Sequence, residues 1–113
     1  MRDNNMRANL LASQIYPLAE THVSGEFNIP TKRLRNGSRR NYIAVTRHII
    51  LWITNKIAPT TWNHLSELAG YTDHTSSRAA VRRVRDLRDV DTAFRKMTDK
   101  LLSDVKEQYQ QRQ

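Results

Sequence analysis

The chain has 113 residues, which is enough for one domain with one modest core, and its net charge is +8 from 19 basic and 11 acidic residues. It contains no cysteine, which excludes disulfide scaffolds, thiolate zinc sites and cysteine nucleophiles. No apolar run approaches the roughly 18 residues of a membrane span, and the polar start of the chain has no signal-peptide pattern. We therefore expect a soluble, cytoplasmic protein with a polyanionic partner.

Apolar residues recur at helical spacing along most of the chain, and no alternating strand pattern of useful length appears. The first helical segment is expected from about residue 5 to 27 and contains Leu10, Leu11, Ile15, Leu18 and Val23. Pro17 lacks an amide hydrogen, so we expect a break there, with Pro17 opening the second piece. Residues 31–35 can form only a short helical turn, and the composition of residues 36–41 predicts a loop.

Residues 42–57 are apolar around most of the helix circumference, which predicts a buried central helix. Thr60 or Thr61 can cap the short helix that follows it. Gly70 suits the left-handed position at which such a helix ends, and residues 71–73 then form a short link.

A further helix is expected to start near His74. Its apolar face contains Ala80, Val81, Val84 and Leu87, and its opposite face carries Arg78, Arg82 and Arg85 about one turn apart. The last helix is expected from about residue 90 to 109, with an apolar stripe of Val90, Phe94, Met97, Leu101, Val105 and Tyr109. We expect residues 108–113 to fray. The predicted fold is thus an all-α bundle in a single domain.

The positive charge is confined to the middle of the chain. Residues 31–88 carry twelve basic and three acidic side chains, whereas the flanking segments are nearly neutral. The basic residues form two clusters: Lys32, Arg33, Arg35, Arg39, Arg40 and Arg47, and then Arg78, Arg82, Arg83, Arg85 and Arg88. Such one-sided clusters favour a nucleic-acid surface. A membrane surface is less favoured, because the arginine-bearing helix lacks an exposed face of Trp, Phe or Leu.

The short helix, the link with Gly70 and the arginine-bearing helix have the order of a helix-turn-helix. In this motif the second helix enters the major groove, and its first residues reach the base edges. Those residues here are Asp73, His74, Thr75, Ser76 and Ser77. The spacing alone does not separate DNA recognition from plain packing of two helices.

Three stretches make the pattern more specific. They are Ile43-Ala44-x-x-Arg47-His48-Ile49, then Leu65 and Leu68, then Gly70-Tyr71-Thr72-Asp73-His74-Thr75-Ser76. Together they resemble the DNA-binding C-terminal domain of the bacterial replication initiator DnaA, over about residues 18–105. The resemblance implies a Trp-repressor-like helical bundle with an embedded helix-turn-helix and a basic loop that enters the minor groove. It leaves residues 1–16 as an N-terminal extension.

The resemblance also implies roles for single residues. Arg39 falls on the arginine of the minor-groove loop, and residues 73–76 fall on positions that touch bases or adjacent phosphates. Arg47 and His48 fall on phosphate-contacting positions, and Arg83 on a basic position further along the recognition helix. The predicted DNA-binding residues are therefore Lys32, Arg33, Arg35, Arg39, Arg40, Arg47, His48, Asp73, His74, Thr75, Ser76, Ser77, Arg78, Arg82 and Arg83.

The sequence departs from the family pattern in the recognition region. Thr72 stands where the family usually has Arg, Ser77 replaces the usual Val, and Asn63 replaces a Pro. We therefore do not assign to this chain the DNA sequence that the family recognises. The nucleotide-binding motif of the family's ATPase domain does not occur. We expect a free-standing DNA-binding module or a fragment of a longer protein.

Structural roles compete with the DNA-binding roles at several positions. Asp73 can be the helix N-cap, and Thr75 can form helix-start hydrogen bonds. Arg47 can lie along the edge of the core with only its head group exposed.

No catalytic or metal-binding constellation is predicted. Asp73, His74 and Ser76 lie on one helical turn and do not converge, so they form no triad. The remaining histidines, His22, His48 and His64, show no ligand spacing. We expect no enzyme, no metal and no cofactor.

We predict sequence-specific binding of double-stranded DNA, first as a transcriptional regulator. The alternative is a replication-control factor at initiator-box sites, and a phage or mobile-element source would suit either role. An alternative of another class is a helical protein–protein interaction module that uses residues 90–109. Beyond DNA, the expected partner is a polymerase, an architectural protein or the initiator, and no membrane is involved. We expect one monomer per DNA site in the bacterial nucleoid.

Overall fold

The computed structural model describes residues 2–35 and 41–112 of the chain. These two ranges contain helices and turns and no strand, which confirms the predicted all-α class. The helices are α1 (Arg2–Glu26), α2 (Thr31–Arg35), α3 (Asn41–Ile57), α4 (Trp62–Ala69), α5 (His74–Val90) and α6 (Thr92–Gln111). Over the described residues, none of them combines the length and apolar character that a membrane span needs.

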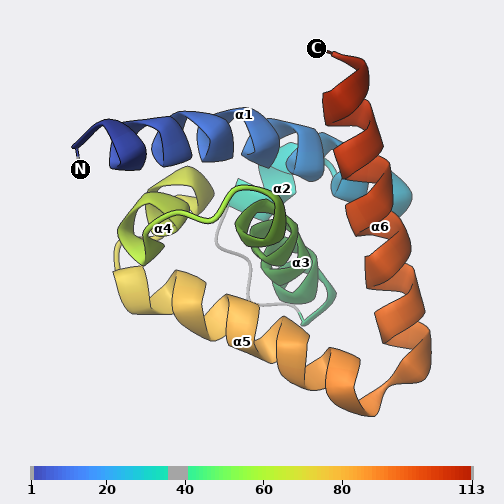
Figure 1. Cartoon of the computed structure of the whole chain (residues 1–113). Helices are drawn as coiled ribbons and strands as arrows, with labels where there is room; N and C mark the ends of the chain where they lie inside the picture. The colour runs from blue at the N-terminus through green and yellow to red at the C-terminus, as the bar shows by residue number, and fades with distance from the viewer. Residues whose placement is uncertain (1, 36–40, 113) are drawn as a thin grey trace.

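Helix α3 lies in the middle of the molecule, as its apolar sequence predicted. Figure 1 shows α1 along one side of α3, α5 along the opposite side, and α6 along a third side. The segment Ile49–Ile53 is buried on every side of the helix. Ile43 and Thr54 are also fully buried near its two ends.

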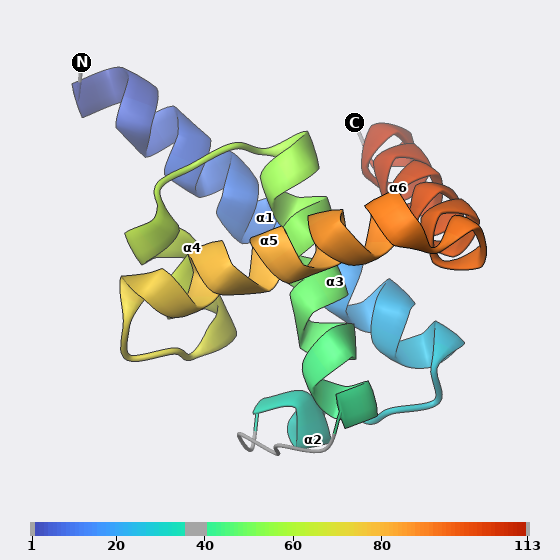
Figure 2. The ribbon, with the colours of Figure 1, turned by 90° about the horizontal axis from the view of Figure 1, so that it is seen from below.

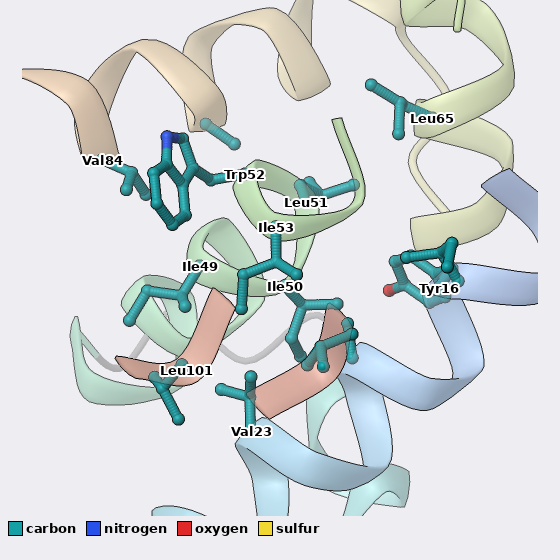
Figure 3. Close-up of a cluster of buried hydrophobic side chains, with 14 of the residues drawn as sticks. Tyr16, Val23, Ile49, Ile50, Leu51, Trp52, Ile53, Leu65, Val84 and Leu101 are labelled. Atoms are coloured by element: carbon teal, nitrogen blue, oxygen red, sulfur yellow. The ribbon is translucent and has the colours of Figure 1, made fainter. Parts of the chain in front are cut away.

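Every neighbouring helix except α2 contributes a labelled side chain to the core around α3 (Figure 3). These side chains are Tyr16 and Val23 from α1, Leu65 from α4, Val84 from α5 and Leu101 from α6, and each is 5% exposed or less. Complete burial of a large apolar side chain stabilises a fold by about 1.5–3 kcal/mol. The packing of α1, α4, α5 and α6 on α3 therefore supplies most of the stability of the bundle.

The expected break at Pro17 does not occur, because α1 is one helix from Arg2 to Glu26. Pro17 itself is exposed, whereas Ile15, Tyr16 and Leu18 are buried. A proline inside a helix costs about 3 kcal/mol. Burial of three large side chains around it outweighs that cost at about 1.5–3 kcal/mol each. Local sequence around Pro17 does not reveal these packing partners, which keep α1 continuous.

The connection from α4 to α5 has the local chemistry that the sequence predicted. Thr61 is the N-cap of α4, and its Oγ1 accepts a hydrogen bond from the His64 amide at 3.1 Å. Gly70 ends α4 with a left-handed φ of 78°. Asp73 then caps α5, with its carboxylate accepting a hydrogen bond from the Thr75 amide at 2.9 Å. The two helices and their four-residue link thus have the order of a helix-turn-helix.

The last helix begins later and ends later than predicted. Val90 is the final residue of α5 and is 83% exposed, so it does not belong to the apolar stripe of α6. Asp91 caps α6 by accepting a hydrogen bond from the Phe94 amide at 3.0 Å. At the other end α6 continues to Gln111, where fraying from residue 108 was expected. The reason is a contact with α1, since the Tyr109 hydroxyl donates to Gln14 at 3.2 Å.

Arg88 connects three helices from within the second basic cluster. Its guanidinium lies 4.5 Å from the centre of the Trp52 ring on α3. Its Nη1 donates to Thr98 Oγ1 at 2.6 Å and pairs with Asp99 at 2.8 Å, both on α6. A charge that is largely withdrawn from solvent, as here with a side chain 20% exposed, is stabilised by such partners. Arg88 therefore belongs to the fold and not to the exposed basic surface.

Replacing Gly70 by alanine is expected to destabilise the protein. Nothing lies within 4 Å of a Cβ at this position, so the cost is conformational: an L-residue at φ 78° loses about 1 kcal/mol. Gly25 is the matched control, because a Cβ there also meets nothing within 4 Å and its backbone is helical. Urea unfolding should show Gly70→Ala below the parent and Gly25→Ala at or above it. Equal stability of the two variants would contradict the left-handed turn.

Candidate nucleic-acid interface

The outer face of α5 carries six of the twelve predicted DNA-binding residues whose side chains the structure describes. Seen from below in Figure 2, α5 crosses in front of α3, and α2 lies beside the N-terminal end of α3. The inner face of α5 packs on α3 through Ala80, Val81 and Val84. The outer face exposes His74, Thr75, Arg78, Arg82 and Arg83, with Ser76 half-buried.

These exposed residues border a shallow groove along α5. Its lining is Thr75, Arg78, Ala79, Arg82, Arg83 and Asp86. Arg85 is also exposed and was left out of the predicted set, although it stands one turn after Arg82. The helical spacing of Arg82 and Arg85 in the sequence already predicts that Arg85 is exposed on the same face. Among residues 78–88 the only acidic side chain is Asp86, so the exposed surface is strongly cationic.

The N-terminus of α5 combines a cap with an exposed carboxylate. The hydrogen bond that Asp73 accepts from the Thr75 amide lowers the pKa of its carboxyl group, so it is ionised at neutral pH. His74 Nδ1 lies 3.6 Å from the same carboxylate oxygen. The capping role of Asp73 is therefore present in the structure. Its base contact stays a prediction, for which a cytosine amino group is the suitable donor.

Ser77 does not face the solvent, and its predicted DNA contact is wrong. It is fully buried, and its Oγ donates to the carbonyl oxygens of Trp62 at 2.8 Å and His74 at 3.0 Å. The physical reason is helical periodicity. Position 77 lies one turn before Val81 on the inner face of α5, and its hydroxyl ties α5 to α4.

Arg47 is also part of the fold, and its phosphate contact stays a prediction. Its exposed fraction is 9%, and its Nη1 donates to the carbonyl oxygen of Leu34 at 3.2 Å. This bond joins α3 to α2. The structural role predicted from the sequence had only the head group exposed, whereas here the guanidinium itself donates to a backbone carbonyl inside the fold.

His48 lies at the edge of a second groove, between α3 and α5. The groove has a volume of about 410 Å³, and its lining is Asn41, Ala44, Val45, His48, Arg83, Val84, Asp86, Leu87 and Val90. Burial, and to a smaller extent the positive charges of Arg83 and Arg47, lower the pKa of His48 from 6.5 to about 4. At neutral pH His48 is therefore an uncharged imidazole, which can donate one hydrogen bond to a phosphate but adds no charge.

The first basic cluster is described only in part. Lys32 and Arg33 are exposed on α2. Arg35 ends α2, and its side chain lies outside the described part of the structure, as do Arg39 and Arg40 altogether. The structure therefore brings α2 close to α3, and α3 close to α5, but does not test the loop contacts.

Comparison with known proteins gives one relevant match. Over 84 residues, which are 74% of this chain, the sequence is 25% identical to the chromosomal replication initiator protein DnaA of Wolinella succinogenes. The chain spans about a fifth of that protein's length, 19%. No protein-family model and no solved structure matches the chain. The similarity supports a DnaA-like segment within this all-α domain.

We expect the stability of the protein to fall as the pH decreases from about 6.5 to about 4. The unfolded chain protonates His48 near pH 6.5 and the folded chain only near pH 4, so acid favours the unfolded state within this window. Urea unfolding across the window should show a shallower pH dependence in His48→Gln. The exposed His74 provides the control, and His74→Gln should keep the parental slope. A parental slope in His48→Gln would contradict the burial of its neutral form.

Proposed function

We propose that this chain binds double-stranded DNA sequence-specifically, with the first turns of α5 in the major groove. The observation that carries the proposal is the one-sided basic face of α5. Thr75, Arg78, Arg82 and Arg85 are exposed on successive turns, while the opposite face of the helix is buried on α3. A duplex offers about one phosphate charge per 1.7 Å of its axis, and a row of arginines neutralises it. The similarity to the replication initiator DnaA is a second, coarser support for DNA binding.

The exposed residues divide into two chemical groups. His74, Thr75 and Ser76 are short side chains at the start of α5 that can reach base edges, where the Thr75 methyl suits a thymine methyl group. Arg78, Arg82 and Arg83 follow them and suit phosphates. On α2, Lys32 and Arg33 add charge beside the start of α3. Base contacts then carry the sequence information, and phosphate contacts fix the position of α5.

The proposed biological role is regulation of transcription at a DNA site, without catalysis. A bound module of this size occupies a promoter, or recruits or blocks a protein partner. A replication-control factor is the second candidate, because the match is to a chromosomal replication initiator. A protein-interaction module that uses residues 90–109 is not favoured. Leu101 and Val105 are buried, and Phe94, Met97 and Tyr109 pack against the core.

Duplex binding should weaken steeply with salt and depend on the α5 arginines. Each neutralised phosphate adds about 0.9 to the slope of log affinity against log salt concentration. Fluorescence anisotropy in about 50–200 mM salt should therefore give a slope smaller by about 0.9 for Arg82→Gln. Lys106→Gln removes the same charge from an exposed position on α6 and should keep the parental slope. If the two variants have equal slopes of log affinity against log salt concentration, α5 is not part of the DNA interface.

Thr75→Ala should reduce discrimination between DNA sites more than it reduces non-specific binding. A good base contact discriminates by about 1–3 kcal/mol, whereas a phosphate contact carries no sequence information. The preferred site is first selected from random duplexes, and the affinities of parent, Thr75→Ala and Arg82→Gln are then compared on that site and on a scrambled duplex. Arg82→Gln should weaken both duplexes alike. If Thr75→Ala also weakens both alike, α5 does not read bases.

A further inference from the structure

A histidine and two carboxylates meet where the first and last long helices pack together. His22 and Glu26 stand one turn apart on α1, and Asp104 comes from α6. One potential ligand atom from each residue lies within 4.8 Å of the other two. His22 Nε2 and Asp104 Oδ2 are 3.2 Å apart. Asp104 is 82 positions from His22, so only the fold brings the cluster together.

We propose that His22, Glu26 and Asp104 bind a divalent transition-metal ion, for which Zn²⁺ has the best fit. Zinc binds histidine nitrogen and carboxylate oxygen at about 2.0–2.2 Å, and tetrahedral angles then place two ligand atoms roughly 3.4 Å apart. The His22–Asp104 separation of 3.2 Å already matches this spacing. Imidazole as a ligand favours zinc over Mg²⁺ or Ca²⁺, which prefer oxygen ligands.

The surroundings of His22 hold its ring in the orientation that this site needs. The other ring nitrogen, Nδ1, lies 3.1 Å from the side-chain amide of Gln108 on α6. The group that faces Nδ1 is the Gln108 amide nitrogen, which donates to the ring and leaves the proton of a neutral imidazole on Nε2, toward Asp104. Ion binding at Nε2 therefore requires the Gln108 amide to turn through 180°, so that its oxygen accepts the proton then held on Nδ1. The side chain of His22 is 16% exposed and that of Asp104 is 31% exposed. The ring is therefore fixed from both sides.

Water can complete the coordination. A surface hollow of about 430 Å³ adjoins the cluster, and its lining is Thr21, His22, Gly25, Glu26 and Gln108. Three protein ligands with an open fourth position agree with a tetrahedral ion that keeps one water molecule. Two carboxylates and a neutral imidazole also balance the double charge of the ion.

The consequence of ion binding is a cross-link between α1 and α6. In Figure 1 these helices meet on the side of the molecule away from α5. The ion would therefore stabilise the closed bundle without touching the α5 surface. A metal-free hydrogen bond between His22 and Asp104 is the competing explanation of the same geometry, and the two differ in their response to zinc.

The test is thermal unfolding of the chelator-treated protein with and without Zn²⁺. At a Zn²⁺ concentration of about 100 times its Kd, Tm should rise by roughly 10 °C. Glu26 is exposed, so Glu26→Gln should keep the metal-free Tm and lose most of the rise. Glu107→Gln removes the same charge from a nearby exposed position of α6 and should keep the full rise. Mg²⁺ should leave the Tm of the parent and of both variants unchanged.

Three results would overturn the proposal. They are no rise in the parent with Zn²⁺, an equal rise in Glu26→Gln, or an equal response to Mg²⁺. Nitrogen-15 NMR of the histidine rings supplies an independent readout, because ligation through Nε2 must shift the His22 ring nitrogens. A shift at His64 instead, which lies 3.9 Å from Glu67, would place the ion elsewhere. DNA affinity should be the same in Glu26→Gln and the parent, so this test does not depend on the proposed DNA-binding function.

Discussion

The burial of α3 is the constraint on which the rest of the structure depends. Because Ile49–Ile53 are buried all around, each surrounding long helix has one face committed to α3 and one face free for solvent. The sequence of α5 obeys this division, with Val81 and Val84 inside and Arg78 and Arg82 outside. The exposed basic surface is thus a consequence of how the core is built.

The charge of the chain overstates the charge available to a polyanion. Two of the arginines in the basic middle segment have structural tasks. Arg47 joins α3 to α2 through the Leu34 carbonyl, and Arg88 stacks on Trp52 while it pairs with Asp99. Charge counting along a sequence cannot separate these two from the exposed arginines, since the difference lies in partners 10 to 36 positions away.

Local chemistry was predictable from the sequence, and contacts between distant residues were not. A threonine cap at position 60 or 61 and the Gly70 turn follow from residue type alone, and the structure has Thr61 and Gly70 in these roles. Pro17 and Ser77 were predicted incorrectly, because the outcome depends on what packs against them. For Ser77 the helical period did predict burial, since Ser77 shares a face of α5 with the buried Val81. Its place in a recognition motif instead favoured the incorrect prediction of a DNA contact. The exposed face of α5 was therefore predictable from the sequence, whereas the role of each single residue was less so.

The position of Arg88 links the core to the proposed recognition surface. DNA recognition by a helix requires that its outer face be held in a fixed orientation, because ordering it on binding would cost affinity. Arg88 contacts α3 through Trp52 and α6 through Thr98, and at the other end of α5 the Ser77 hydroxyl bonds to the Trp62 carbonyl of α4. Both ends of α5 are thereby fixed to separate helices. Arg88 and Ser77 are therefore not available to DNA, but they hold the exposed arginines of α5 in a rigid row.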